Sequence, residues 1–361
     1  MHVGYTPEQE KLRASLREYF AALPKDAPYR EVVRRLGRDG WLAVEGRSRM
    51  DQLIFADEAA LAGVQVPFLT LYTVGPTIAR HGTEQQKAEL LPGIEAGEIH
   101  FAIGYSEPEA GTDLAALRTR AVRDGDHYVI NGQKMWTSLI EDADYVWLAC
   151  RTDPEAPRHQ GLSILIVPTG SPGFSWTPVR TVAGPSTSAT YYDDVRVPVS
   201  ALVGAENQGW RLITDQLNRE RVALTSAAPL QRALREVGEW ARRTGAIERE
   251  WVRLHLARVH ARTEALKLLN WRVCVSEGAP AATRASAGKV YGTELAIEAY
   301  RLLMEIIGPA ATIRAGEPGA VLAGRIEAMY RASLILTFGG GTNEVQRDII
   351  AAGALGLPVR R

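Results

Sequence analysis

The stretch F-A-I-G-Y-S-E-P-E-A-G-T-D at residues 101–113 marks the point where the pattern of the sequence changes. Before it, apolar residues recur with a helical period from Thr6 to about residue 98. After it come short runs rich in β-branched and aromatic residues, separated by Gly, Pro, Asp and Asn. From about Gln208 the helical period returns and continues to about Leu357. The sequence therefore predicts an α+β chain in which helices flank a β-domain.

We expect three domains from this pattern. Residues 1–98 form an N-terminal helical domain, residues 99–205 a central antiparallel β-barrel or sandwich, and residues 206–361 a C-terminal helical bundle. No Gly-rich turn of the Rossmann kind joins a strand to a helix. A dinucleotide cofactor, if present, is bound in another way.

Two capping boxes mark helix starts in the first domain. Thr6 with Gln9, and Thr83 with Gln86, have the spacing at which each side chain bonds the other's backbone. The second of these helices is expected to end at the Pro92-Gly93 break.

Composition limits the partners. Lys plus Arg and Asp plus Glu both number 42, so no overall charge favours nucleic acid or an anionic membrane. Cys150 and Cys274 match no metal or disulfide spacing and are interpreted as core residues of a reducing compartment. No apolar signal-peptide region and no run of eighteen apolar residues occurs. We expect a soluble cytoplasmic protein.

Two polar motifs stand out in the β-region. Y-S-E-P-E-A-G-T-D at 105–113 can offer backbone N–H groups and hydroxyls to an electron-rich ring or a thioester, although by itself it is typical of an ordinary polar turn. I-N-G-Q-K-M-W-T-S at 130–138 combines a hairpin signal, Asn131-Gly132, with a strand that ends in Trp136. Trp136 by itself reads as a core residue.

Together these motifs resemble the acyl-CoA dehydrogenase family over nearly the whole chain. L-N-R-E-R at 217–221 and G-T-N-E-V-Q-R-D-I-I at 341–350 extend the resemblance in the same order. It implies FAD as the cofactor, with Trp136 against the flavin ring and the Ser138 hydroxyl near flavin N5, where donors stabilise developing negative charge. The residues that it places at the cofactor are Tyr105, Ser106, Gly111, Thr112, Trp136, Thr137, Ser138, Arg221 and Thr342, and those at the substrate are Thr112, Gly339, Gly340 and Gly341.

The resemblance also bears on the catalytic base, a carboxylate that removes a proton from carbon 2 of the thioester. Many family members carry a Glu where this chain has Gly340, whereas the isovaleryl and long-chain enzymes carry it at the position of Glu220. Helical spacing agrees, because Glu220 interrupts an apolar stripe of Ile213, Leu217 and Leu224. The alternative is an ion pair with a nearby arginine.

The chain departs from the family where C-terminal helices hold the neighbouring subunit's FAD. An Arg-x-x-Phe-Gly segment is absent from residues 240–250, and Glu305 and Pro309 replace the Gln and second Gly of a Gln-x-x-Gly-Gly segment. An acidic residue repels a pyrophosphate and proline removes a donor. Two arrangements remain open: a homotetramer, or a hetero-oligomer with a second dehydrogenase-like subunit, as in actinobacterial steroid side-chain enzymes.

The expected reaction converts an acyl-CoA to a trans-2-enoyl-CoA, with an electron-transferring flavoprotein as acceptor. The glycine run at 339–341 leaves space for a bulky or branched acyl group such as a steroid side chain, or merely permits a tight turn. The alternatives are an acyl-CoA oxidase or flavin monooxygenase on the same fold, and a non-catalytic partner subunit.

Overall fold

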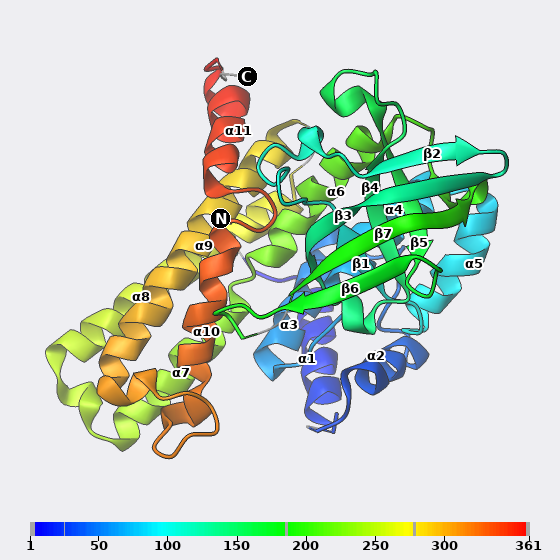
Figure 1. Cartoon of the computed structure of the whole chain (residues 1–361). Coiled ribbons are helices and arrows are strands. Elements are labelled where there is room, and N and C mark those ends of the chain that lie inside the picture. Colours follow the sequence, from blue (N-terminus) through cyan, green and yellow to red (C-terminus); the bar gives the residue numbers. More distant parts are fainter. Residues whose placement is uncertain (1–3, 25, 185–186, 277–278, 359–361) are drawn as a thin grey trace.

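Helices lie at both ends of the chain and strands between them (Figure 1). The computed structural model describes residues 4–24, 26–184, 187–276 and 279–358, and for residues 217–224 and 279–281 it describes the backbone alone. The predicted order of helices, β-region and helices is confirmed.

The N-terminal helices begin where the capping boxes predict. The side chains of Thr6 and Thr83 each accept a hydrogen bond from the backbone N–H three residues later. The side-chain oxygens of Gln9 and Gln86 in turn accept from the backbone N–H groups of Thr6 and Thr83. The helices are α1 (Pro7–Ala21), α2 (Tyr29–Arg38), α3 (Arg49–Ala62), a π-helix η1 (Leu69–Val74), α4 (Gly75–His81) and α5 (Glu84–Glu95).

The predicted helix end at Pro92-Gly93 is wrong. Helix α5 continues through Pro92 to Glu95, because the carbonyl of Pro92 still accepts from the N–H of Ala96 at 2.9 Å. The chain leaves the helix at Gly97, where a φ of +71° favours glycine and an added Cβ would lie only 2.5 Å from the carbonyl oxygen of Val33.

The β-region is one eight-stranded sheet with the order β6-β7-β3-β2-β4-β5-β8, and β1 pairs with β4 outside this path. Most neighbours are antiparallel, as predicted, whereas β1–β4 and the single pair that joins β2 to β4 are parallel. The strands are β1 (Phe101–Gly104), β2 (Arg120–Asp124), β3 (His127–Ser138), β4 (Tyr145–Arg151), β5 (Leu162–Pro168), β6 (Phe174–Val179), β7 (Thr187–Pro198) and β8 (Leu202–Val203).

The hairpin predicted at Asn131-Gly132 is also wrong. The turn lies earlier, at Gly125-Asp126, because Asp124 pairs with His127. Gly132 lies instead within β3 at an irregularity in the pairing with β7. A Cβ at Gly132 would come 2.7 Å from the Cα of Thr119, so this position requires glycine for close backbone approach.

Strand β4 is buried on both of its faces, which explains its continuous apolar run. Val146, Leu148 and Cys150 pack with the interior of the β-region, whereas Trp147 and Ala149 pack with the N-terminal helices. Cys150 is thus a core residue, as predicted, while Cys274 is only half-buried.

The C-terminal helices gather around α9, which contacts every other long helix of this group. Figure 1 shows α11 standing beside α9 and beyond the rest of the bundle. Among the described residues, none of the helices combines the length and apolar character needed to cross a membrane. The helices are α6 (Gly209–Leu224), α7 (Ala228–Arg243), α8 (Glu250–Cys274), α9 (Ala279–Ile307), α10 (Arg325–Ser333) and α11 (Asn343–Leu355).

Candidate functional site

A buried ion pair holds the loop that follows β1. The carboxylate of Glu107 lies 2.8 Å from the Nζ of Lys134, and neither side chain is more than 5% exposed. Glu107 also accepts from the backbone N–H groups of Arg118 and Thr119 at 2.7 and 2.8 Å. Burial alone would raise the pKa of Glu107, but Lys134 and these donors hold that pKa below its ordinary value. The loop is therefore fixed by a charged anchor.

The two polar motifs predicted from the sequence meet through the backbone. The carbonyl of Ser106 accepts from the N–H of Met135 at 2.8 Å, and the carbonyl of Tyr105 accepts from Lys134 at 2.9 Å. Farther along the same loop, Gly111 and Thr112 are exposed. The loop is thus bonded to β3 at Tyr105 and Ser106 and reaches the surface at Gly111 and Thr112.

Trp136 is an exposed side chain at that end of β3. Trp136 is 53% exposed and has a φ of +66°. Leu139, three residues later, is 43% exposed and has a φ of +63°. The interpretation of Trp136 as a core residue is wrong. Left-handed backbone at non-glycine residues is uncommon and collects at functional sites. This end of the strand therefore carries an exposed aromatic side chain.

The hydroxyls beside Trp136 differ in their surroundings. Ser138 is exposed and donates to the hydroxyl of Thr187 at 3.2 Å. Thr137 is fully buried against Thr190, with 3.4 Å between the two hydroxyl oxygens. Of the two predicted cofactor contacts, only Ser138 presents its side chain on the surface.

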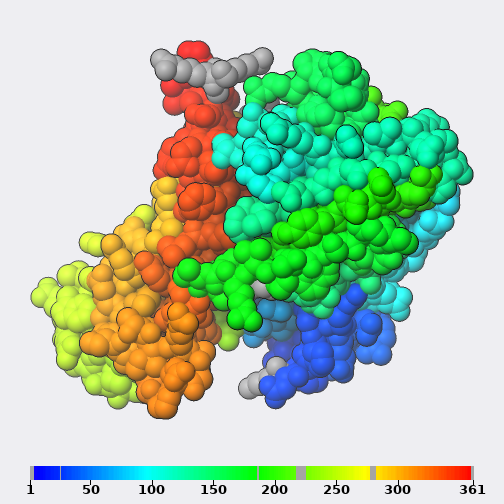
Figure 2. All heavy atoms as spheres, in the orientation of Figure 1, coloured from blue at the N-terminus to red at the C-terminus, as the bar shows by residue number. Residues whose placement is uncertain are grey.

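This end of the sheet meets the C-terminal helices. The loop after β6 reaches α10, where Arg331 donates to the carbonyl of Val182. Helix α10 leads through the short helix η9 (Leu334–Thr337) to the glycine run at 339–341. Figure 2 shows the green β-region against the orange and red C-terminal helices. The loop between β6 and β7, which leads into the strand paired with the end of β3, thus contacts the helix that precedes the glycine run.

The glycine run has its own conformational requirements. Gly340 and Gly341 have φ values of +67° and +84°, and a Cβ at Gly341 would come 2.7 Å from the Nε2 of Gln346. At Gly339 the nearest atom to an added Cβ is 3.7 Å away. Thr342 caps α11 by accepting from the N–H of Val345. The run thus makes a tight turn, which was one of the two expectations.

The base candidate lies on α6, whose register is fixed by Gln216. The amide oxygen of Gln216 accepts from the hydroxyl of Tyr105 and, at 3.3 Å, from Nε1 of Trp147; its amide nitrogen donates to Thr77 at 3.1 Å. Gln216 therefore joins α6 to the β-region and to α4. Because Tyr105 directs its hydroxyl into this junction, its predicted cofactor contact stays a prediction.

Glu220 and Arg221 have described backbone within α6, but their side chains lie outside the described residues. Position 220 follows Gln216 by four residues, so the two share one helix face. The helix predicted from the spacing of Ile213, Leu217, Glu220 and Leu224 is confirmed, and Ile213 is fully buried.

Sequence reasoning missed the residues that hold this region together. Glu107 and Lys134 both lie within the two motifs, yet nothing in their spacing indicates that they pair. Gln216 falls just before the L-N-R-E-R segment and belongs to none of the motifs. A buried polar residue on an apolar helix stripe was the available signal.

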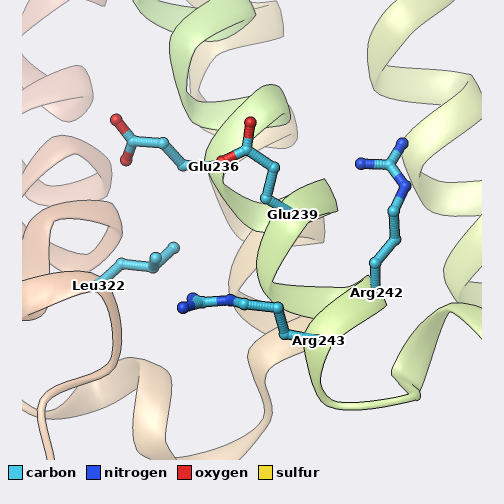
Figure 3. A pocket seen from close by; sticks show the side chains of 5 residues that line it. All are labelled: Glu236, Glu239, Arg242, Arg243 and Leu322. Atoms are coloured by element: carbon cyan, nitrogen blue, oxygen red, sulfur yellow. The ribbon is translucent and has the colours of Figure 1, made fainter.

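A separate surface groove of about 440 Å³ lies on the C-terminal bundle. Figure 3 shows Arg243 extending toward Leu322 while Arg242 projects from the other side of α7. The lining of the groove mixes carboxylates and guanidinium groups, and of the predicted catalytic and cofactor residues whose side chains the structure describes, none lines it. Among the described residues, no group of His, Cys, Asp and Glu could hold a metal ion.

Comparison with known proteins gives consistent results for the whole chain. Family models for the N-terminal, middle and C-terminal domains of acyl-CoA dehydrogenases match residues 6–98, 102–195 and 207–355. Acyl-CoA dehydrogenase FadE26 of Mycobacterium tuberculosis is 60% identical over 99% of both chains, and FadE29 of the same organism is 48% identical over 99% of both.

Solved structures agree with the sequence matches. A chain of the ChsE4-ChsE5 complex from Mycobacterium tuberculosis is 61% identical, with a TM-score of 0.93 over 100% of both chains. A chain of the Tcur3481-Tcur3483 steroid ACAD is 49% identical, with a TM-score of 0.95 over 100% of both chains. The protein therefore belongs to the acyl-CoA dehydrogenase family and is an oxidoreductase.

Proposed function

We propose that the chain catalyses FAD-dependent α,β-dehydrogenation of an acyl-CoA to a trans-2-enoyl-CoA, with Glu220 as the base. The observation that carries this proposal is the place of position 220 on α6. Gln216, one turn earlier on the same face, contacts Tyr105 at the root of the polar loop. Glu220 therefore lies about one helical turn beyond the junction between α6 and the loop proposed to hold the thioester.

The residues present fit a flavin. Trp136 offers an exposed ring at the end of β3, and Ser138 offers an exposed hydroxyl two residues later. Gly111 has open space around it, so the backbone of the polar loop can approach a planar ring closely. When bound there, FAD supplies the acceptor for the hydride that leaves carbon 3.

The chain's own part in the chemistry is proton removal and positioning. A carboxylate at position 220 takes the proton from carbon 2, and donors of the polar loop stabilise the negative charge that develops on the thioester oxygen. Further cofactor or substrate contacts are proposed from Ser106, Thr112, Thr137, Arg221, Thr342 and the glycine run at 339–341.

We assign bulky acyl groups, such as steroid side chains, as the substrate class. The relative Tcur3481-Tcur3483 is named a steroid ACAD. In this chain the position used for the base in many family members is Gly340, whose φ of +67° disfavours any larger residue. The base on α6 and the small residue opposite together leave room beside the thioester.

We propose a hetero-oligomer with a second dehydrogenase-like subunit. Two matched structures are complexes of two differently named chains. Here Glu305 replaces the Gln of the family's segment, and its carboxylate lies 3.0 Å from Nε2 of His255. A carboxylate at this place weakens the attraction for a neighbour's pyrophosphate, and Pro309 offers it no backbone N–H. An electron-transferring flavoprotein is the proposed acceptor.

The test of the base compares two changes of the same chemistry on α6. In the co-expressed pair of subunits, Glu220→Gln should abolish reduction of bound flavin by a steroid side-chain CoA ester under anaerobic conditions, while visible absorbance shows that flavin remains bound. Asp215→Asn, at a half-buried position of the same helix, should reduce flavin at nearly the original rate. Equal rates in all three proteins would remove Glu220 from the mechanism.

The test of the split site is the ratio of flavin to chain. Purified alone, the chain should hold little flavin; co-expressed with a neighbouring dehydrogenase-like subunit, the pair should hold flavin and elute together. One flavin per chain without a partner would establish the homo-oligomer instead.

A further inference from the structure

The link between α6 and α7 is held by three separate helices. The first contact comes from α8, where Nδ2 of Asn270 donates to the carbonyl of Thr225 at 2.7 Å. Asn270 is 2% exposed and Thr225 is 5% exposed. A buried hydrogen bond to the first residue after α6 therefore fixes where that helix ends.

The second contact comes from α3. The hydroxyl of Ser226 donates to Oδ1 of Asp57 at 2.5 Å and accepts from the N–H of Ala228 at 3.1 Å. Ser226 thus joins the start of α7 to a carboxyl group of the N-terminal helices. The end of α6 is tied to the same N-terminal helices that Gln216 reaches through Thr77.

The third contact comes from α9, and it is a contact of shape. A Cβ at Gly292 would lie 2.8 Å from Cβ and 3.1 Å from Cγ2 of Thr225, and 3.0 Å from Cδ1 of Leu266. The distance of 2.8 Å is shorter than real Cβ contacts, and the other two are tighter than nearly all of them, so glycine lets α9 lie this close to Thr225. By contrast, a Cβ at Gly288, one turn earlier on α9, meets its nearest atom at an ordinary 3.7 Å.

From these contacts we propose that Asn270, Gly292 and Asp57 are positioning residues that hold Glu220 in its catalytic place by fixing Thr225 and Ser226. This inference rests on the proposed function, because it takes Glu220 as the base. Position 220 lies between two fixed points, Gln216 four residues before it and Thr225 five residues after it. A helix fixed on both sides cannot slide or rotate along its axis without breaking buried hydrogen bonds.

The contacts that fix Thr225 and Ser226, here called the anchor, should affect the rate of proton removal, because a catalytic base must be placed accurately. Proton removal requires the carboxylate within hydrogen-bond reach of carbon 2, and a misplacement of about 1 Å can cost on the order of a hundredfold in rate. Flavin and substrate bind elsewhere, so loss of the anchor should lower kcat and leave KM nearly unchanged.

The test is a matched pair of glycine substitutions on α9. In the co-expressed pair of subunits, Gly292→Ala should lower kcat about tenfold or more, with KM within threefold and the flavin spectrum unchanged. Gly288→Ala gains the same helix propensity and should keep kcat and KM. Asn270→Ala removes the hydrogen bond without adding bulk and should lower kcat in the same direction, which covers the case in which Gly292→Ala folds poorly.

Hydrogen exchange of the protein without substrate separates this inference from the proposed base. The anchor predicts faster amide exchange in the last turn of α6 for Gly292→Ala and Asn270→Ala, and no change for Gly288→Ala. Faster exchange with unchanged kcat, or unchanged exchange, would overturn the positioning role. Glu220→Gln tests the base independently: if that variant retains turnover, the base assignment fails whatever the exchange data show.

Discussion

The ammonium of Lys134 and the carboxylate of Glu107 lie 2.8 Å apart inside the protein, where the polar loop after β1 meets strand β3; both segments carry proposed flavin contacts. Lys134 also donates to the carbonyl of Tyr105, so one cation bonds the loop at two points. Breaking a buried pair by removing one partner is far more costly than removing both, because the remaining charge is uncompensated.

Lys134→Met should therefore destabilise the fold by about 3 to 5 kcal/mol, measured by urea unfolding. Adding Glu107→Gln to this variant should restore more than half of the loss, since Gln keeps an oxygen for the N–H groups of Arg118 and Thr119. If the free energy of unfolding of Lys134→Met lies within about 1 kcal/mol of that of the original protein, the buried pair contributes no more to stability than an exposed ion pair.

Asp57 predicts a pH dependence of stability. Burial raises its pKa from 3.8 to about 7, so the folded chain binds this proton more tightly than the unfolded chain does. The contribution to stability is fully present below pH 3.8 and is lost as pH rises through about 7. Asp57→Asn keeps an oxygen that can accept from the hydroxyl of Ser226 and removes the group that titrates.

The variant should match the original at pH 4 and be more stable at pH 8, by about 1.4 kcal/mol for each unit of pKa shift. Urea unfolding at both pH values measures the difference between the two proteins, which cancels the titration of all other groups. A difference that does not grow between pH 4 and pH 8 would contradict the burial of an ionisable Asp57.

Ser138 offers a test of the proposed contact near flavin N5. Ser138→Ala removes the hydroxyl and should slow anaerobic flavin reduction about ten- to a hundredfold, measured by stopped-flow absorbance. Ser138→Thr keeps the hydroxyl and should retain most of the rate. Equal slowing in both variants would mean that packing at the end of β3, rather than the hydroxyl, had been disturbed.

The glycine run supplies a second matched pair. Gly341→Ala forces a side chain onto a φ of +84° and against Gln346, and should lose about 1 to 3 kcal/mol of stability. Gly339→Ala meets nothing closer than 3.7 Å and should change stability by less than about 0.5 kcal/mol. Thermal unfolding of both variants checks this, and similar losses in the two would argue against a conformational need for glycine at 341.

Local chemistry could be predicted from the sequence where short-range signals decide the structure. The capping boxes at Thr6 and Thr83 are confirmed, because cap and partner are three residues apart and depend on nothing else. The predicted turn at Asn131-Gly132 is wrong for the opposite reason. At Gly132 the close approach of Thr119 requires glycine, and Thr119 is a neighbour in space that precedes β2.

The candidate site shows the same division. Trp136 and Ser138 lie in one short motif, so their common location followed from the sequence, although the exposure of Trp136 did not. Lys134, Gln216 and Gly292 act through partners on other elements, at sequence separations from 27 to 139 for the first two. Only the folded chain reveals such pairs, because no spacing rule connects them.

Gln216 also has a consequence for how the protein comes apart. One amide receives hydrogen bonds from β-region residues Tyr105 and Trp147 and gives one to Thr77 in the N-terminal helices, while its own helix belongs to the C-terminal part. No single part can melt without stranding buried polar atoms in the other two. Unfolding should therefore be cooperative across all three parts. A proteolytic cut in any one of them should make the whole chain susceptible to further proteolysis.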